Sequence, residues 1–231
     1  MSEELDMLNA IRKLLIDTRT VPSTALKLRE RSVEEAVDYI KADSAFDGIQ
    51  VAISNIVALK VALNRITLDG IYAEFGVFKG QTLEIIAKAA PDGQVVHGFD
   101  SFIGLPESWG GTSKDKGAFD VGGRPPEINA SNVEFHIGFF DKTVPEWNTA
   151  HEGTFAFVHL DADLYSSTKT VFDTLGDRFV PGTVVVFDEY FGYHGWQLHE
   201  HKAFMEFLRR TGLGYEPIII GHMNLAVQLT E

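Results

Sequence analysis

The sequence predicts an α/β fold, a doubly wound sheet of seven mainly parallel strands preceded by a helical N-terminal part. From Gly70 onward, short strand-like apolar runs alternate with segments of helical periodicity, which is typical of βαβ units. The last two strand-like runs are joined only by residues 221–224, which favours an antiparallel hairpin. The 231 residues suffice for one such domain with a modest extension.

The first part of the chain, residues 1–68, is expected to be a helical subdomain because no strand-like run interrupts it. Its first helix is indicated by apolar residues at helical spacing, namely Leu5, Leu8, Ile11, Leu14 and Leu15. Ser32 and Glu35 form a capping-box pattern that predicts the start of a second helix. A third helix is expected over residues 48–66. These helices could also pair subunits, so a homo-oligomer stays open.

The rest of the chain, residues 69–231, contains the predicted sheet. Strands are expected at residues 71–75, 95–99, 133–137, 155–160, 183–187, 216–220 and 225–229. Helices are expected at residues 82–90, 166–179 and 198–211. The first five strands are expected to run parallel, and the last two to form a hairpin at the edge of the sheet.

A long segment rich in Gly, Pro and charge, residues 101–132, separates the second and third predicted strands. Loops of this length in a compact domain are usually functional lids or disordered. The segment leaves the carboxyl end of a strand, where ligands bind in open α/β sheets. We therefore expect it to close over a binding site.

The composition excludes several classes of protein. Lys and Arg total 20 and Asp and Glu total 33, so the formal net charge is −13. Since an acidic surface repels phosphate, nucleic acid and anionic membranes are poor partners. The chain has no Cys, which excludes disulfides and thiolate metal sites. The acidic N-terminus is unlike a signal peptide, and no apolar run approaches the roughly 20 residues of a membrane span, so a cytoplasmic location is expected.

A glycine-containing turn follows the first predicted strand, between Glu74 and Thr82. Gly76 and Gly80 allow a sharp turn and close approach of a ligand to the backbone, although their spacing is not that of dinucleotide binders. Asp100 ends the next strand, 20 residues after Gly80, where a carboxylate can accept hydrogen bonds from ribose hydroxyls. Each feature alone fits a simple turn, but together they point to an adenosine-containing cofactor.

Four carboxylates follow two predicted strands that should be neighbours. Asp161 and Asp163 come after the fourth strand, and Asp188 and Glu189 come after the fifth. Close like charges are costly, and a divalent cation removes that cost. With oxygen ligands and no Cys, Mg²⁺, Ca²⁺ or Mn²⁺ fits best. The alternative is helix N-capping by Asp163 and Asp188.

Other side chains near the predicted site allow two interpretations. Gly138 and Phe139 follow the third strand, where Phe139 could cover an adenine ring or belong to the core. His159 lies within an apolar strand and is expected to be a core histidine. Three histidines near the last predicted helix could line a substrate pocket or simply be solvated, namely His194, His199 and His201.

Four segments of the predicted sheet form a joint signature. They are Glu74-Phe75-Gly76-Val77 with Gly80, Phe99-Asp100-Ser101-Phe102 with Gly104-Leu105-Pro106, Leu160-Asp161-Ala162-Asp163-Leu164-Tyr165 with Ser167-Thr168, and Asp188-Glu189-Tyr190. Together they resemble the TylF/MycF family of macrocin-type O-methyltransferases over about residues 70–210. The helical N-terminus adds little to this resemblance.

The resemblance implies a class I methyltransferase fold with a Rossmann-like sheet, S-adenosylmethionine as methyl donor, and Mg²⁺ dependence. It assigns the metal ligands to Asp161, Asp188 and Glu189, and the general base to Asp163. The family often has Asp at the position of Glu189, which is one methylene longer here. The implied cofactor-binding residues are Glu74, Phe75, Gly76, Gly80, Thr82, Asp100, Ser101, Gly138 and Phe139.

The expected activity is therefore methylation of a hydroxyl on a small, sugar-containing acceptor. A glycosylated natural product, a surface-polysaccharide sugar and a catechol-like phenol all stay open, because a fold does not transfer substrate choice. Two other functions are alternatives: a metal-dependent hydrolase or phosphatase, and a catalytically inactive cofactor-binding module of the same fold. The spacing of the glycines disfavours a nicotinamide oxidoreductase.

Overall fold

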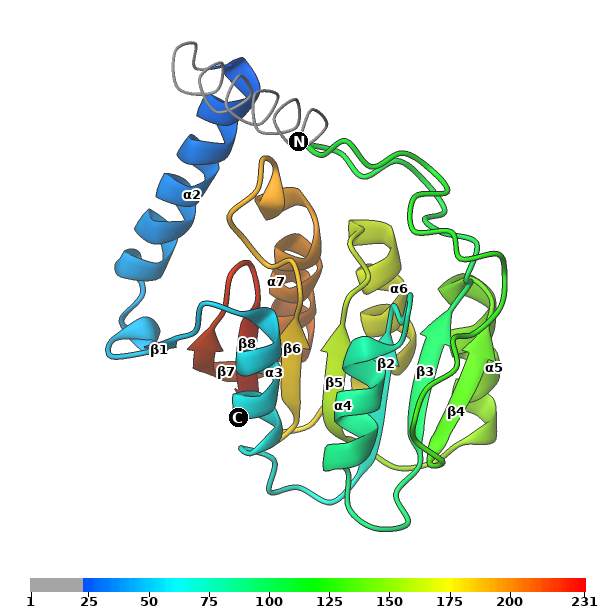
Figure 1. The fold of residues 1–231 in the computed structure, drawn as a ribbon. Helices are drawn as coiled ribbons and strands as arrows, with labels where there is room; N and C mark the ends of the chain where they lie inside the picture. The colour runs from blue at the N-terminus through cyan, green and yellow to red at the C-terminus, as the bar shows by residue number, and fades with distance from the viewer. Residues whose placement is uncertain (1–22) are drawn as a thin grey trace, which may run out of the picture.

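The computed structural model describes residues 23–231 as one open sheet with helices on both faces (Figure 1). The helices are α2 (Thr24–Ala42), α3 (Asn55–Leu63), α4 (Gln81–Ala89), α5 (Phe140–Ala150), α6 (Tyr165–Leu175) and α7 (Glu200–Thr211), with short 3-10 turns η1 (Ser44–Phe46), η2 (Gly176–Arg178) and η3 (Trp196–Leu198). The strands are β1 (Gln50–Val51), β2 (Ile71–Phe75), β3 (Val96–Asp100), β4 (Val133–Ile137), β5 (Phe155–Leu160), β6 (Val184–Phe187), β7 (Gly214–Ile220) and β8 (Leu225–Thr230).

The sheet has eight strands in the order β1-β7-β8-β6-β5-β2-β3-β4. β8 runs antiparallel to both of its neighbours, and every other pair is parallel. The predicted parallel strands and the terminal hairpin are therefore confirmed. All seven predicted strands occur, and their ends agree within two residues.

The predicted count of seven strands is wrong by one. The additional strand, β1, pairs parallel with β7 and covers the hairpin, which would otherwise form the edge of the sheet. It lies in the part of the chain that was expected to be wholly helical. β1 has only two residues, and both are exposed. Such a strand carries no alternation of apolar and polar residues that a sequence could reveal.

The predicted start of the second helix at Ser32 is also wrong. α2 begins at Thr24, and the side chain of Ser23 caps it by accepting a hydrogen bond from Leu26 N. Ser32 lies inside α2, where its hydroxyl donates to the carbonyl of Leu28 at 2.9 Å. Ser can bond to the preceding turn in this way, so the same residue pattern occurs at a helix start and within a helix. The first predicted helix lies outside the described residues.

α3 and α4 cover one face of the sheet, and α5, α6 and α7 cover the other (Figure 1). The third predicted helix is shorter than expected, because η1 and β1 occupy its first residues and α3 starts at Asn55. α3 packs against β6, β7 and β8. The proposed division after residue 68 stays a prediction, since no observation separates the two parts.

The core consists of two apolar clusters, one on each face of the sheet. On one face, Leu59 of α3 and Leu83 of α4 pack on the strands, and on the other face Trp147, Phe172 and Phe204 come from α5, α6 and α7. Both layers hold the strands in register and bring their carboxyl ends to one edge. Among the described residues, no helix combines the length and apolarity needed to cross a bilayer.

Candidate active site

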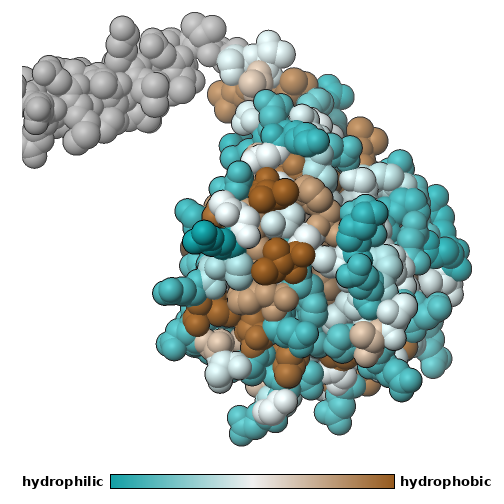
Figure 2. Space-filling view, turned by 90° about the vertical axis from the view of Figure 1, so that its right-hand side faces the viewer, coloured by the Kyte–Doolittle hydropathy of each residue, from teal (hydrophilic) through white to brown (hydrophobic). Residues whose placement is uncertain are grey.

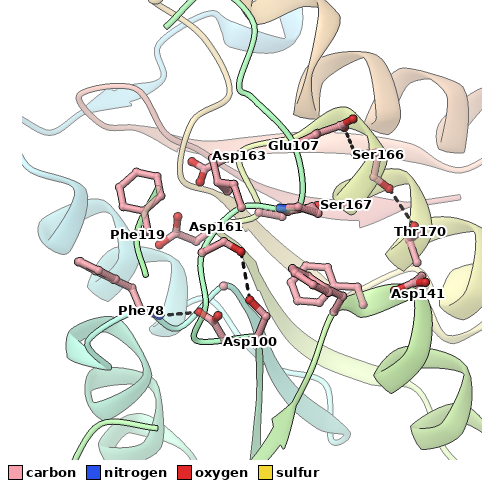
Figure 3. A pocket seen from close by; sticks show the side chains of 18 of the residues that line it. Phe78, Asp100, Glu107, Phe119, Asp141, Asp161, Asp163, Ser166, Ser167 and Thr170 are labelled. Carbon is pink, nitrogen blue, oxygen red and sulfur yellow. Dashed lines mark hydrogen bonds between the residues drawn. The ribbon is translucent and has the colours of Figure 1, made fainter. Parts of the chain in front are cut away.

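A cavity of about 550 Å³ opens at the carboxyl ends of the parallel strands (Figure 3). Its walls come from the turn after β2 and from the segments that follow β3, β4, β5 and β6. β2 lies between β3 and β5, so the strand order reverses beside it. Ligands of open α/β sheets bind at such a reversal, which makes this cavity the candidate site.

Nine of the thirteen site residues predicted from sequence line this cavity. They are Gly76, Asp100, Ser101, Gly138, Phe139, Asp161, Asp163, Asp188 and Glu189. The other four do not line it, and they are Glu74, Phe75, Gly80 and Thr82. The nine come from five separate strand ends, so the topology of the sheet brings them together.

Gly76 is required by the packing of the turn against the neighbouring strand end. Its φ is +97°, and a Cβ added there would lie 1.7 Å from the carbonyl oxygen of Asp161. The turn and the strand end are also joined by a 2.9 Å hydrogen bond from Asp161 N to Phe75 O. Phe75 itself is buried and stacks on Phe99 with ring centroids 4.6 Å apart. The glycine therefore lets the loop carrying Asp161 approach the turn.

The carboxylate of Asp100 stabilises the same turn by hydrogen bonds to its backbone. One oxygen accepts hydrogen bonds from the backbone nitrogens of Val77 and Phe78, both at 2.8 Å. The other oxygen accepts from Phe102 N at 2.7 Å. Two carboxylate oxygens offer about four acceptor positions, so one remains for a ligand in the cavity. The predicted contact of Asp100 with a ribose stays a prediction.

Three carboxylates meet on the floor of the cavity. Oxygens of Asp161, Asp163 and Glu189 lie within 4.8 Å of one another (Figure 3 shows the first two). They meet because β5 and β6 are parallel neighbours with Leu160 opposite Phe187. Burial, and then the charges of the neighbouring carboxylates, raises the pKa of Asp161 and Glu189 well above the ordinary values.

Asp163 has an unusual backbone conformation and is the most buried of the three clustered carboxylates. Its φ is +59°, a left-handed conformation that is uncommon outside glycine. Burial, followed by the charge of Asp188, raises the pKa of its carboxyl to about 7, although Lys114 opposes this. An acid with such a pKa exchanges protons readily near neutral pH.

Asp188 lines the cavity, but protein groups already hold its carboxylate. Asn55 Nδ2 donates to both oxygens at 3.1 and 3.2 Å, and Asn224 Nδ2 lies 3.4 Å from one of them. Nε2 of His159 lies 3.7 Å away. Burial alone would raise the pKa of Asp188. The hydrogen bonds and charge of His159 and the side-chain amide of Asn55 outweigh burial and hold the pKa below its ordinary value.

His159 and Glu74 form a buried polar pair behind the site. Nδ1 of His159 lies 2.7 Å from a carboxylate oxygen of Glu74, and both side chains are fully buried. Burial lowers the pKa of His159, but Asp188 and Glu74 outweigh burial and raise it well above its ordinary value. The imidazolium thus lies between two carboxylates, so Glu74 supports Asp188 from behind and does not face the cavity.

The model of a methyltransferase domain matches residues 73–190, which run from β2 to the segment after β6. This range holds the glycine turn, Asp100 and all four carboxylates. The chain belongs to the methyltransferase domain family.

The chain is similar to one curated protein and to two solved structures. The 8-demethyl-8-(2,3-dimethoxy-alpha-L-rhamnosyl)-tetracenomycin-C 4'-O-methyltransferase of Streptomyces olivaceus is 28% identical over 167 residues, which cover 61% of each chain. The chain thus spans less than two thirds of this relative. The solved O-methyltransferase NovP is 23% identical, with a TM-score of 0.60 over 76% of this chain and 81% of that one. The calicheamicin methyltransferase CalS11 is 19% identical, with a TM-score of 0.63 over 99% and 93%. Both structures share the fold.

The donor set of this methyltransferase domain fits a hard divalent cation. The candidate ligands are all carboxylates, and a set of oxygen ligands without sulfur or imidazole suits Mg²⁺ or Ca²⁺. Oε2 of Glu189 is buried and has no hydrogen-bond partner among the described residues. A cation accounts for this buried oxygen and for the convergence of three negative charges.

The cavity of the methyltransferase domain also fits a nucleoside-containing cofactor. Its volume falls within the usual range of small-ligand pockets, roughly 300–1,000 Å³. The rings of Phe78, Phe139 and Phe140 supply an apolar wall, and Asp100 and Ser101 add polar groups. An apolar wall with few polar groups is the ordinary composition of such a site.

Several residues of the site were missed at the sequence level. Glu200 is fully buried and accepts hydrogen bonds from Ala162 N at 3.3 Å and Glu189 N at 3.4 Å. Phe78 and Phe119 form an edge-to-face pair with centroids 5.6 Å apart at the cavity wall (Figure 3). No motif marks these residues, because they come from a helix, a turn and a long loop.

The three histidines that were left open do not line the cavity in the described part of the chain. Nε2 of His199 lies 2.9 Å from the carbonyl oxygen of Gly110, which ties it to the segment after β3. Nδ1 of His201 lies 2.9 Å from the hydroxyl of Tyr190. His199 and His201 therefore support the loops around the site.

Proposed function

We propose that the protein is an S-adenosylmethionine-dependent, Mg²⁺-assisted O-methyltransferase that methylates a hydroxyl of a small, sugar-containing acceptor. One observation carries the proposal. Three carboxylates converge on the floor of a cavity that they share with the glycine turn and Asp100. Membership of the methyltransferase domain family supports the same reaction.

Asp161 and Glu189 would hold the metal ion, with Asp188 completing the acidic set beside them. S-adenosylmethionine, when bound, supplies an activated methyl group, and Mg²⁺ supplies positive charge that acidifies an acceptor hydroxyl. Asn55 and His159 fix Asp188 in place, so its carboxylate is oriented before any ligand arrives. Such groups behind a metal ligand commonly set its orientation and basicity.

Asp163 is the proposed general base. Its carboxylate faces the cavity, and its pKa of about 7 leaves a substantial ionised fraction at neutral pH. It would accept the proton of the acceptor hydroxyl as that oxygen bonds to the methyl carbon. General-base assistance of this kind typically contributes roughly 10²–10⁴-fold to the rate.

The segment after β3 would exclude water from the reaction. Glu107 belongs to this segment, lines the cavity, and accepts a 2.5 Å hydrogen bond from the hydroxyl of Ser166 at the start of α6. Phe119 adds an apolar ring to the same wall. Holding the reactants together in a dry cavity lowers the barrier to methyl transfer.

The proposed acceptor is a sugar hydroxyl because the rhamnosyl-tetracenomycin relative is named as a 4'-O-methyltransferase. The resemblance to the TylF/MycF family points the same way. The test is transfer of a labelled methyl group from S-adenosylmethionine to a panel of glycosides and catechols, with Mg²⁺ or with EDTA. We expect transfer to a glycoside that EDTA abolishes and added Mg²⁺ restores.

The variant Asp163→Asn should lose at least about a hundredfold in turnover. S-adenosylhomocysteine should still raise its melting temperature as it does for the unchanged protein. Asp177→Asn is the matched control, because Asp177 is exposed in η2 and remote from the cavity. Full activity of Asp163→Asn, or methyl transfer undiminished in EDTA, would contradict the assigned roles. Absence of any thermal shift with S-adenosylhomocysteine would contradict the cofactor.

A further inference from the structure

A cluster of three histidines and a glutamate lies on the sheet face that α5 covers. His97 and Phe99 of β3 point to this face, because alternate residues of a strand share a side. Glu134 and His136 of β4 point to the same side, since β3 and β4 are parallel and place His97 opposite Glu134 and Phe99 opposite His136. Strand periodicity thus sets three metal-ligating side chains next to one another.

α5 brings the fourth member of the cluster. Trp147 lies on the buried side of α5, and His151 caps the end of the helix one turn later. The ring of His151 stacks on that of Trp147 with centroids 4.6 Å apart. Its centroid lies 5.1 Å from that of His97. The helix therefore closes the cluster from above the strands.

The distances within the cluster suit a single small cation. Ligand atoms of His97, Glu134 and His151 lie within 4.8 Å of one another. Nδ1 of His97 lies 3.1 Å from Nε2 of His136, and each of these nitrogens lies 3.9 Å from a carboxylate oxygen of Glu134. Ligand atoms of a tetrahedral zinc site, with bonds of about 2.0–2.2 Å, are separated by roughly 3.3 Å. Glu134 is more than half exposed, so its side chain can move to close the remaining gap.

Hydrogen bonds already set the ring nitrogens for metal binding. Nδ1 of His151 lies 2.9 Å from Trp147 O and can only donate to that carbonyl, so Nε2 is the nitrogen of His151 that can offer a lone pair to a metal. Histidine ligands of metals usually donate their other nitrogen in this manner. The indole of Trp147 donates to Nδ1 of His97 at 3.3 Å, so a metal ion bound at this nitrogen would replace the indole as its partner.

We propose that His97, Glu134 and His151 form a Zn²⁺ site that joins β3, β4 and α5, and that His136 completes it by exchanging its hydrogen bond with His97 for a bond to the metal. Three imidazoles and one carboxylate are a nitrogen-rich donor set that favours zinc over the hard cation proposed for the carboxylate cluster. This site does not depend on the proposed methyltransferase activity, because its ligands lie outside the cavity.

The site is reachable from solvent. β4 is an edge strand, and Glu134 lies exposed along it. Figure 2 views the molecule from the side of β4 and α5, and hydrophilic residues cover much of this face. A metal ion can therefore reach Glu134 from solvent without unfolding of the sheet.

Cobalt titration tests the proposal directly. The untagged full chain is stripped with EDTA, placed in excess Mg²⁺ to saturate the carboxylate cluster, and titrated with Co²⁺. We expect one cobalt ion per chain, with the intense visible absorption of a four-coordinate nitrogen-containing site, and displacement of that ion by Zn²⁺. An oxygen-only, six-coordinate site gives weak absorption, so the spectrum separates the two clusters.

His151→Gln and Glu134→Gln should each weaken cobalt binding by at least about tenfold. His222→Gln is the matched control, because His222 is exposed in the turn between β7 and β8 and should leave binding unchanged. Because Glu134 is exposed, Glu134→Gln should fold normally. It therefore still tests the proposal if His151→Gln fails to fold. Absence of the four-coordinate spectrum, or unchanged affinity in Glu134→Gln, would overturn the proposal.

Discussion

Glu200 joins the two loops that carry the carboxylate cluster. One of its oxygens accepts from Ala162 N, between Asp161 and Asp163, and the other accepts from Glu189 N. Burial, and then the charge of Asp163, raises the pKa of Glu200 to about 8. A single buried side chain thus fixes the spacing between ligands that come from β5 and β6.

The variant Glu200→Ala should lose affinity for Mg²⁺ while it keeps affinity for S-adenosylhomocysteine. Truncation frees both loops and leaves two backbone N–H groups without their acceptor, so we expect an apparent Kd for Mg²⁺ at least about tenfold higher. Glu200→Gln retains the volume and one acceptor, so its effect should be smaller. Melting temperatures over a Mg²⁺ series, with and without the nucleoside ligand, provide the measurement.

Glu206→Ala is the control on the same helix, because Glu206 bonds to the hydroxyl of Tyr165 away from the cluster. A Glu200→Ala protein with unchanged Mg²⁺ affinity would show that the loops hold their spacing without it. Equal losses for both ligands would instead indicate general damage to the fold.

Among individual residues, sequence patterns predicted the carboxylates at the strand ends and missed the side chains that hold those carboxylates in place. The carboxylates of Asp161 and Asp188 were predictable because parallel strands bring their carboxyl ends to one edge. Asn55 reaches Asp188 across 133 residues of chain, and Asn224 reaches it across 36. No local spacing records such contacts, so only the folded chain reveals them.

The junction of the β2 turn with the end of β5 depends on the absence of a side chain at Gly76. Gly76→Ala should destabilise the fold strongly, since the new Cβ would lie 1.7 Å from the carbonyl oxygen of Asp161. Gly93→Ala is a matched control, because Gly93 has a similar φ of +82° with no atom within 4 Å of the added Cβ. The control carries only the conformational cost, about 1–2 kcal/mol.

We expect Gly76→Ala to cost at least about 2 kcal/mol more than Gly93→Ala in the free energy of unfolding. Urea denaturation of the two variants beside the unchanged protein gives both values. Equal costs would mean that backbone conformation alone explains the glycine. A loss of Mg²⁺ response in folded Gly76→Ala protein would link the turn to the placement of Asp161.

Elements with long apolar runs were predicted well, and elements without them were not. The strands β2, β4 and β5 begin and end at the predicted residues because their side chains form continuous or alternating apolar patterns. β1 has two exposed residues and therefore no such pattern. α5 was not predicted, and Pro145 inside it interrupts the helical pattern that a sequence would show.

Over the whole molecule, the buried acids make stability depend on pH and on metal. In the metal-free protein, Asp163 and Glu200 have a raised pKa, to about 7 and about 8, and Asp161 and Glu189 are raised as well. The folded chain then binds more protons than the unfolded chain over this range. Folding stability must therefore fall as pH rises through the folded pKa values.

His97 and His201 act in the opposite direction, but only at lower pH. Burial lowers the pKa of His97 and His201 to about 4, so protons bind preferentially to the unfolded chain below its ordinary histidine pKa of about 6.5. Their contribution raises stability as pH increases up to that value and is then constant. From about pH 6.5 to 8 these two histidines no longer contribute a slope, and His159, whose pKa is raised, acts in the same direction as the acids.

We expect the melting temperature of the metal-free protein to fall between about pH 6.5 and 8, and Mg²⁺ to remove most of that fall. Mg²⁺ binds the ionised carboxylates of the folded chain alone, so at a hundred times its Kd it should stabilise by about 2.7 kcal/mol. Scanning calorimetry in EDTA and in Mg²⁺ across this window provides the measurement. Asp163→Asn should flatten the metal-free curve, since it removes one of the titrating groups. A metal-free melting temperature that rises with pH in this window would contradict the buried, mutually repelling carboxylates from which the proposed metal site is inferred.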